Sequence, residues 1–495
     1  MTDSDKKCHF ERIRTTRGFS VIEQHVYLDI DPENETIDGH TEVVIIPHLK
    51  KIKDIRLNCR QCSIVSVSAN NLSCGFTLYD FMKDNINGTI RSPESYYAYL
   101  PADTGELFIK FPDELFVHRM KRKPVAFTNN DDAASLTPSN DNADTVSVLS
   151  DTSVRTESTI YSKPSISSKY MNISQNNDVY FYKYQPIVLS IRYRLVKPEG
   201  SLFFQTAGNT PHLYTWNTID GYHIESSFGT GTRGWVPCID DEIERYPWKL
   251  FYSIPPEYSL YSCGSFIEKM TNVETKKCIY KYEVNYPTPA NNIGFTAGKY
   301  VEKNSNEDDI APYHIYYAAP LEGTMAARLD AVTNQTRGIY DYIQSMFRSS
   351  FPIDMLPELT AVIFVDDSPG LFSIYQGLIL LDSKLLFDEH DTFFLPHYAH
   401  IFITAYFLMY FGGYIQLYKW NDLWLPLGVA SYLGLLYVQQ NISNDIFKYY
   451  IKTMLITCCQ IEEEREGLFP IHNEKELRPI YIDNEEYSCS TYIMQ

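Results

Sequence analysis

The segment WNDLWLPLGVASY, residues Trp420–Tyr432, decides how the second half of the chain is interpreted. It opens a run of apolar residues at helical spacing that predicts a helix over Leu423–Gln440. The same periodicity predicts further helices over Met325–Arg348, His397–Phe411 and Ile446–Glu463. Short apolar runs predict buried strands at Leu359–Val365 and Ile379–Leu381. The second half of the chain is therefore predicted to be rich in helices.

The first part of the chain carries the pattern of β-strands. Apolar and polar residues alternate from Phe19 to Pro47, which is typical of an antiparallel sheet with one face in solvent. Similar runs are Ile187–Leu195, Leu202–Gln205, Trp248–Ile254 and Ile279–Val284. We therefore expect an α+β fold, with a β-rich domain over residues 1–304 and an α-rich domain over residues 305–495.

One segment within the β-rich half differs in composition. From Asn129 to Asp178, Ser, Thr, Asn and Asp dominate and aliphatic residues are few. Such a segment cannot bury enough apolar surface to offset its conformational entropy. Because strand-like sequence resumes after Tyr180, we predict a disordered insertion at about residues 129–178.

The charge balance limits the partners of the chain. Its 495 residues include 43 Lys and Arg against 62 Asp and Glu, a formal net charge of −19. This balance argues against autonomous, salt-driven binding of nucleic acid. Two locally basic segments, Lys50–Lys53 with Arg56 and Met120–Lys123, could contact phosphates, although a solvated charged surface is the favoured interpretation.

The cysteines and the first residues indicate a reducing compartment. Ten cysteines lie at irregular positions, and the polar segment Met1–Lys7 lacks the apolar stretch of a secretory signal. Cys59 and Cys62 form the only CxxC motif, and no second pair follows at the spacing of a zinc ribbon. We expect these two to be ordinary, half-buried thiols.

An uncharged stretch from Thr392 to Tyr418 raises the alternative of a membrane span. It exceeds the roughly 20 residues that cross a bilayer. However, Pro396, His397, His400 and five tyrosines within it are costly to place against lipid. A helix buried in a large protein core is the favoured interpretation.

On these residues the chain resembles the M1-type zinc aminopeptidases. Trp420–Tyr432 is similar to that family's W-N-D-L-W-L-N-E-G-F-A-S-Y segment, and Gly234–Asp240 to its P-C-F-D-E-P segment. Phe351–Ile353 resembles its Y-P-L segment. The resemblance runs along nearly the whole chain except the predicted insertion. It implies a β-rich, saddle-shaped N-terminal domain followed by a thermolysin-like domain.

The resemblance also implies that the zinc site is lost. The family needs H-E-x-x-H on one helix, because residues four apart can both reach one metal ion, with a glutamate on the next helix as third ligand. Aligned on Trp420–Tyr432, the two histidine positions are Thr404 and Leu408, and the general-base position is Ala405. The third-ligand position is Leu427. We therefore expect no catalytic, cofactor-binding or metal-binding residues and no cofactor.

Other positions of the family's site are also changed or weakly matched. The glutamate that grips the substrate's amine corresponds to Ile374, before the Gln376–Ile379 segment that resembles W-G-L-I. Tyr487 could match the tyrosine that stabilises the oxyanion, although a packed or surface tyrosine is the favoured interpretation. His397 and His400 could form a displaced zinc site, but no carboxylate lies at the third-ligand spacing.

Within this fold family the chain resembles the inactive, aminopeptidase-like TATA-binding-protein-associated factors of the general transcription factor TFIID. Trp235–Cys238 and Asn58–Cys62 are similar to their W-V-P-C and N-A-K-Q-C segments. The resemblance implies a nuclear, non-catalytic scaffold that binds other TFIID subunits and helps engage core-promoter DNA near the initiator. It implies no membrane and no small-molecule substrate.

Two alternatives stay open at this point, an aminopeptidase with an altered or displaced metal site and a membrane protein built around Thr392–Tyr418. The family resemblance further implies that the chain is the N-terminal part of a longer protein, continued by a helical-repeat region after residue 495.

Overall fold

The computed structural model describes most of the chain in separate ranges. The described residues are 18–79, 105–115, 184–198, 200–207, 210–216, 231–240, 244–303, 314–318, 324–348, 359–387, 394–413, 415 and 424–464. The predicted insertion at 129–178, the basic segment Met120–Lys123, Phe351–Ile353 and Tyr487 lie outside them.

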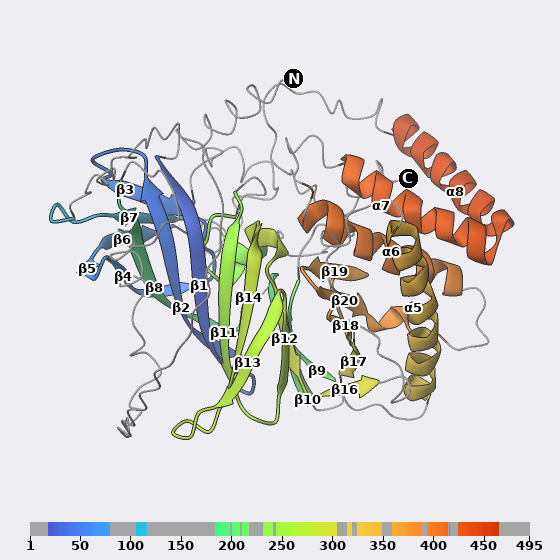
Figure 1. Cartoon of the computed structure of the whole chain (residues 1–495), viewed down its shortest axis with the longest axis horizontal. Helices are drawn as coiled ribbons and strands as arrows, with labels where there is room; N and C mark the ends of the chain where they lie inside the picture. The colour runs from blue at the N-terminus through green and yellow to red at the C-terminus, as the bar shows by residue number, and fades with distance from the viewer. Residues whose placement is uncertain are drawn as a thin grey trace, which may run out of the picture.

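An eight-stranded sheet forms the largest layer of the β-rich half (Figure 1). Its strand order is β13-β14-β11-β1-β2-β8-β4-β5. The strands are β1 (Phe19–Asp31), β2 (Thr36–Pro47), β4 (Ser63–Ala69), β5 (Leu72–Ser73), β8 (Ile187–Val196), β11 (Tyr246–Ile254), β13 (Ser265–Thr271) and β14 (Cys278–Thr288). The alternating segment Phe19–Pro47 forms β1 and β2, and the four similar runs predicted from the sequence lie in β8, β9 (Leu202–Ala207), β11 and β14.

The pairing of β1 corrects one detail of the sequence prediction. β1 and β2 form the expected antiparallel hairpin, with Phe19 opposite Pro47 and Asp31 opposite Thr36. On its other side, however, β1 pairs in parallel with β11. The chain between β1 and β11 is far longer than a hairpin loop, and only such a long connection allows neighbouring strands to run in the same direction. The sheet is therefore mixed.

Two smaller sheets complete the β-rich half. A four-stranded sheet has the order β12-β15-β10-β9, and a three-stranded sheet has the order β3-β7-β6. Their strands are β3 (Asp54–Leu57), β6 (Gly75–Leu78), β7 (Leu107–Lys110), β9 (Leu202–Ala207), β10 (Thr210–Thr215), β12 (Ser259–Ser262) and β15 (Phe295–Gly298). Short 3-10 turns lie at Gly231–Gly234 and Ala290–Asn292.

A five-stranded sheet, β16-β17-β18-β20-β19, lies between the β-rich half and the helices (Figure 1). Its strands are β16 (Tyr300–Lys303), β17 (His314–Ala318), β18 (Ala361–Val365), β19 (Phe372–Tyr375) and β20 (Leu378–Asp382). The domain boundary predicted between residues 304 and 305 falls after β16 and stays a prediction.

Both faces of this sheet are buried, as the unbroken apolar runs in β18 and β20 require. Ile363 of β18 and Leu380 of β20 belong to the core of the β-rich half. Their neighbours Phe364 and Leu381 point the other way and belong to the core formed with the helices. One sheet thus contributes to two hydrophobic cores.

Helices follow on the second side of the sheet, where α5 and α6 contact its strands and α7 packs on α6. They are α5 (Thr324–Arg348), α6 (Phe394–Gly413), α7 (Trp424–Tyr437) and α8 (Asn444–Glu464), with a 3-10 turn at Ser383–Leu385 and a π-helical turn at Val438–Ile442 between α7 and α8. All four predicted helices are confirmed, with ends that differ by a few residues.

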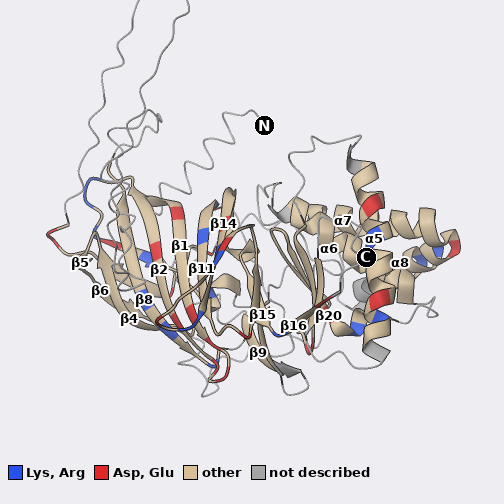
Figure 2. Ribbon diagram, turned by 60° about the horizontal axis from the view of Figure 1, so that its bottom comes forward, with Lys and Arg blue, Asp and Glu red and all other residues tan. Residues whose placement is uncertain are grey.

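α6 and α7 contain no charged side chain (Figure 2). α6 is nonetheless a core helix: every residue from Ile401 to Tyr410 is buried. In the described part of the chain, no helix is long and apolar enough to cross a membrane.

Candidate functional site

The positions that correspond to the peptidase zinc site lie on α6 and α7, which pack against each other. Thr404, Ala405 and Leu408 are on α6 and Leu427 is on α7, and all four side chains are at least 96% buried. Ala405, Leu408 and Leu427 belong to one hydrophobic cluster. Three of the four positions that hold a zinc ligand or the general base in the peptidases thus carry hydrocarbon side chains, and the fourth carries a neutral threonine hydroxyl, which is a poor zinc ligand.

The one hydroxyl among these four positions is already engaged. Thr404 Oγ1 donates a hydrogen bond of 2.7 Å to the carbonyl oxygen of His400, one turn earlier in α6. Gly434 of α7 lies close to the same turn, because a Cβ atom there would be only 2.8 Å from both His400 Cδ2 and the His400 carbonyl oxygen. The two helices therefore approach each other too closely at this point for any larger side chain.

His400 contacts α7 instead of reaching toward a metal site. Its Nε2 atom shares a hydrogen bond of 3.0 Å with Ser431 Oγ, and its ring lies 6.3 Å from that of Tyr450 on α8. Burial and the neighbouring His397 lower the pKa of His400 to about 4, and burial lowers the pKa of His397. Both imidazoles are therefore neutral at physiological pH. Among the described residues, no group of three or more His, Cys, Asp or Glu side chains could hold a metal ion.

The strand that grips the substrate's amine in peptidases corresponds to β19. Ile374 of β19 is 2% exposed and belongs to the same hydrophobic cluster as Leu408 and Leu427. α6 packs directly on this strand, and the Gly377 N–H just beyond it points at Met409 Sδ at 3.2 Å. The position of the amine-binding carboxylate is thus part of a packed core.

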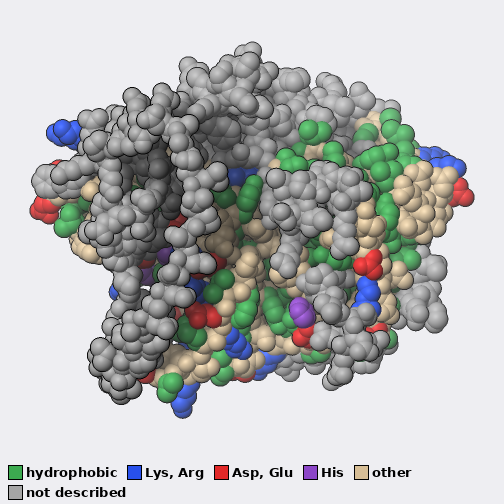
Figure 3. All heavy atoms as spheres, in the orientation of Figure 1, with side chains coloured by type: hydrophobic (Ala, Val, Ile, Leu, Met, Phe, Trp, Pro, Cys, Tyr) green, Lys and Arg blue, Asp and Glu red, His purple; other side chains and the backbone are tan. Residues whose placement is uncertain are grey.

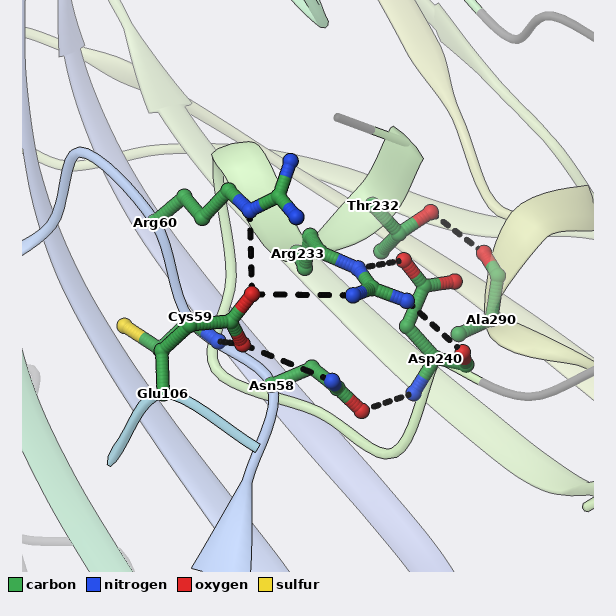
Figure 4. Close-up of polar contacts among 8 residues, drawn as sticks. All are labelled: Asn58, Cys59, Arg60, Glu106, Thr232, Arg233, Asp240 and Ala290. Carbon is green, nitrogen blue, oxygen red and sulfur yellow. Dashed lines mark hydrogen bonds and ion pairs between the residues drawn. The ribbon is translucent and has the colours of Figure 1, made fainter. Parts of the chain in front are cut away.

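A second cluster consists of charged and polar side chains next to the Gly234–Asp240 segment (Figure 4). Glu106 Oε1 accepts a hydrogen bond of 2.9 Å from Arg60 Nε and lies 3.6 Å from Arg233 Nη1. Arg233 Nε donates at 2.6 Å to Asp240 Oδ2. Asn58 Oδ1 accepts from the Asp240 N–H at 3.1 Å. These contacts join three chain segments that are far apart in sequence.

The charges in this cluster stabilise one another. The side chains of Arg60 and Glu106 are only 3% and 1% exposed. Burial alone would raise the pKa of Glu106, but Arg233 and Arg60, together with the backbone N–H of Cys59, lower it to about 2. Glu106 is therefore a buried carboxylate that stays ionised at physiological pH. Its surroundings are fully occupied by protein groups, so the cluster holds chain segments together.

The CxxC thiols lie beside this cluster and differ from the prediction in one respect. Cys59 and Cys62 are 0% and 1% exposed, so they are completely buried and not half-buried. Burial raises the pKa of the Cys59 thiol well above its ordinary value, as it does for the neighbouring Cys238. Cys59 and Cys238 are therefore neutral thiols in the core.

Sequence patterns missed the Glu106 cluster entirely. Arg60 and Glu106 are 46 residues apart in the sequence. Glu106 lies in a segment with no recognisable motif. The available signals were the Asn58–Cys62 and Trp235–Cys238 resemblances, because paired backbone hydrogen bonds between Asn58 and Cys238, 2.8 and 3.0 Å long, join these two segments.

Curated relatives of the chain are transcription initiation factor TFIID subunit 2 proteins. The one from Caenorhabditis elegans is 21% identical over 504 residues, which is 99% of this chain and 39% of the relative. The one from Gallus gallus is 20% identical over 484 residues, 95% of this chain and 34% of the relative. The chain thus spans between a third and two fifths of the length of these relatives. No family model matches it.

Solved structures with the same fold are zinc peptidases and a related hydrolase. Yeast LTA4 hydrolase in complex with bestatin superposes with a TM-score of 0.57 at 12% identity, over 97% of this chain and 58% of that one. An M1 zinc metallopeptidase from Deinococcus radiodurans gives 0.53 at 14% identity, over 96% and 80%. The predicted fold class and the predicted resemblance to a TFIID subunit are both confirmed.

Proposed function

We propose that this chain is the aminopeptidase-like part of a TFIID subunit that acts as a non-catalytic scaffold in transcription initiation by RNA polymerase II. The similarity to TFIID subunit 2 across nearly the whole chain supports a role in transcription initiation. The similarity to peptidases is one of fold alone.

One observation carries the non-catalytic part of the proposal. The two helices that correspond to the peptidase site are present and pack against each other, yet Leu408 and Leu427 fill ligand positions and Ala405 the base position. A leucine side chain offers zinc no ligand, and an alanine cannot move a proton. Ile374 likewise replaces the carboxylate that binds the substrate's amine. The side chains that would capture the substrate and those that would activate the water molecule are therefore both replaced.

The proposed partners are the other TFIID subunits, in the nucleus, with core-promoter DNA contacted within the assembled complex. The net charge of −19 supports a DNA contact that depends on the complex, because the isolated chain repels a polyphosphate. Lys50, Lys51 and Lys53 are exposed around the start of β3 and supply local positive charge.

Affinity purification tests the scaffold role. A tagged copy of the protein, isolated from nuclear extract and analysed by mass spectrometry, should recover the TATA-binding protein and its associated factors in stoichiometric amounts. Recovery of none of them would contradict the proposal. A matched control is a tagged copy with Trp235→Ala, a fully buried residue, which should unfold the β-rich half and lose the same partners.

A separate measurement tests the absence of peptidase activity. The purified chain should contain far less than one equivalent of zinc and should not hydrolyse aminoacyl-coumarin substrates. Near-stoichiometric metal together with hydrolysis that a chelator abolishes would instead support the alternative of an M1-type aminopeptidase with a displaced site.

A further inference from the structure

The small sheet β3-β7-β6 lies at the end of the β-rich half that is far from the helices (Figure 1). One face of it is apolar and covered, since Ile55, Leu57, Leu107 and Ile109 are at most 3% exposed. Successive side chains of a strand point to opposite faces. The residues between these four therefore form a second, outer face, which carries polar and charged groups.

Two cations lie side by side on this outer face. Asp54 of β3 is opposite Lys110 of β7, and Arg56 is opposite Phe108. Arg56 and Lys110 are therefore diagonal neighbours, with Cβ atoms about 7–8 Å apart, and both are exposed. The guanidinium carbon of Arg56 lies 5.4 Å from the centre of the Phe108 ring, a cation–π contact that keeps the arginine over the sheet.

The loop before β3 brings three more cations to the same place. Lys50, Lys51 and Lys53 are all exposed. The loop is fixed to the sheet, because the Phe111 N–H donates a hydrogen bond of 2.9 Å to the Lys53 carbonyl oxygen. Phe111 follows directly after Lys110, so the fold joins a basic segment of the sequence to a lysine almost 60 residues later. The resulting basic patch consists of Lys50, Lys51, Lys53, Arg56 and Lys110.

The cations of the basic patch are not neutralised within the described part of the chain. None of them forms an ion pair with a carboxylate there, whereas Lys277 lies 2.5 Å from Asp29 Oδ1 and Arg194 lies 3.6 Å from Asp38 Oδ1. The same two segments expose three acidic residues against the five cations of the patch, in a chain whose net charge is −19. The patch is thus a local positive surface with unused charge. The three acidic residues are Asp54, Asp113 and Glu114.

We propose that the basic patch contacts the phosphate backbone of duplex DNA. This inference rests on the proposed function, in which the assembled complex contacts core-promoter DNA, and it names the surface of this chain that does so. The cations lie on a loop and on an open sheet face, which suits the continuous line of charge along a duplex. Such contacts position a protein on DNA and carry no sequence information themselves.

Fluorescence anisotropy with a labelled promoter duplex tests the proposal on the 495-residue chain. The affinity should fall as salt rises from about 50 to 200 mM, with a slope of about −0.9 in log K against log salt for each phosphate contact. A triple variant, Lys50→Ala with Lys51→Ala and Lys53→Ala, should bind about tenfold or more weakly at low salt. Its slope should be shallower by about 2–3, and the loss should be the same for an unrelated duplex.

A matched control removes the same number of charges elsewhere. Lys299→Ala, Lys448→Ala and Lys452→Ala together change three exposed lysines outside the basic patch, so the net charge of the control equals that of the patch variant. The control should keep the wild-type salt slope. Asp54→Asn removes a negative charge from the patch itself and should tighten DNA binding. All these side chains are exposed, so every variant should keep the wild-type melting temperature.

Three results would overturn the proposal. They are a wild-type chain without affinity for the duplex at low salt, equal weakening by the patch variant and the control, and loss of binding to polyglutamate in the patch variant with DNA binding unchanged. The last result would assign the patch to an acidic protein partner.

Affinity purification separates this proposal from the proposed function. The patch variant should recover the same TFIID subunits from nuclear extract as the wild type, because the basic patch is proposed to contact DNA. A wild-type chain that recovers no subunits contradicts the proposed function, whereas an intact set of subunits with unaltered DNA binding by the patch variant contradicts the basic patch alone.

Discussion

Replacing Glu106 with Gln should remove the charge that joins the Asn58–Cys62, Glu106 and Gly231–Asp240 segments. The glutamine is nearly isosteric, so it can still accept hydrogen bonds from the Cys59 N–H and Asn58 Nδ2. Arg233 keeps its contact to Asp240, but Arg60, whose side chain is 3% exposed, loses its counter-ion. The main effect is therefore the loss of the Glu106 carboxylate from its place beside a buried guanidinium.

The pKa of Glu106 gives the size of the effect. Its ordinary value is 4.5 and its value in the folded protein is about 2. That difference corresponds to about 3 kcal/mol of stability, which agrees with the roughly 3–5 kcal/mol lost when one partner of a buried ion pair is removed. Because the folded-state pKa is the lower one, the stabilisation is complete above pH 4.5 and decreases as the pH falls toward 2.

Urea denaturation followed by tryptophan fluorescence measures this effect, since Trp235 and Trp248 are buried in the same core. Glu106→Gln should lower the free energy of unfolding by about 3 kcal/mol at pH 7 and by less than half of that at pH 3. The exposed Glu274→Gln serves as the control and should change it by less than about 0.5 kcal/mol. A loss below about 1 kcal/mol at pH 7, or an equal loss at both pH values, would refute the reasoning.

Three further outcomes are expected. In a variant with the peptidase zinc residues restored, the free energy of unfolding measured in chelator should fall by at least about 3 kcal/mol, because buried leucines are exchanged for polar groups. Added zinc should restore this free energy only partly, and the variant should stay inactive. Peptidase-like turnover of an aminoacyl substrate would contradict this expectation. The changes in this variant are Thr404→His, Ala405→Glu, Leu408→His and Leu427→Glu. Gly434→Ala should lower the free energy of unfolding, measured by thermal unfolding, by about 1–3 kcal/mol, because the new methyl group would clash with His400. Gly428→Ala should be neutral or stabilising, because the space around Gly428 is open. The isolated chain should bind promoter DNA weakly in gel-shift assays at low salt and lose that binding at physiological salt; tight, salt-resistant binding would reveal a groove-reading element.

The sequence predicted those parts of the fold that have a strong period. Alternation over Phe19–Pro47 predicted β1 and β2, and helical spacing predicted α5 to α8, because burial of one face imposes these patterns directly. The π-helical turn at Val438–Ile442 was not predicted, since apolar spacing continues through it. The parallel pairing of β1 with β11 was also missed, because a pattern within one strand does not identify its neighbour in the sheet.

The positions of the candidate site were predictable where a motif determined the alignment with the peptidase family. Trp420–Tyr432 located Thr404, Ala405, Leu408 and Leu427, and all four lie where helices α6 and α7 pack, in a hydrophobic core. The exposed apolar surface over α7 and α8 (Figure 3) was not predictable, because the same periodicity describes buried and exposed apolar faces. Leu425, Tyr432 and Leu455 are between 51% and 59% exposed there.

The five-stranded sheet also determines how the protein can unfold. Because Ile363 and Leu380 serve one core while Phe364 and Leu381 serve the other, neither half can open without uncovering a face of the shared sheet. The connection is reinforced where Gly264 N–H donates to the Gln376 carbonyl oxygen at 2.8 Å. We therefore expect the described parts of the two halves to unfold together, because opening either one would expose a face of the shared sheet to solvent. Because both cores depend on this sheet, a substitution that loosens one half should also lower the stability of the other.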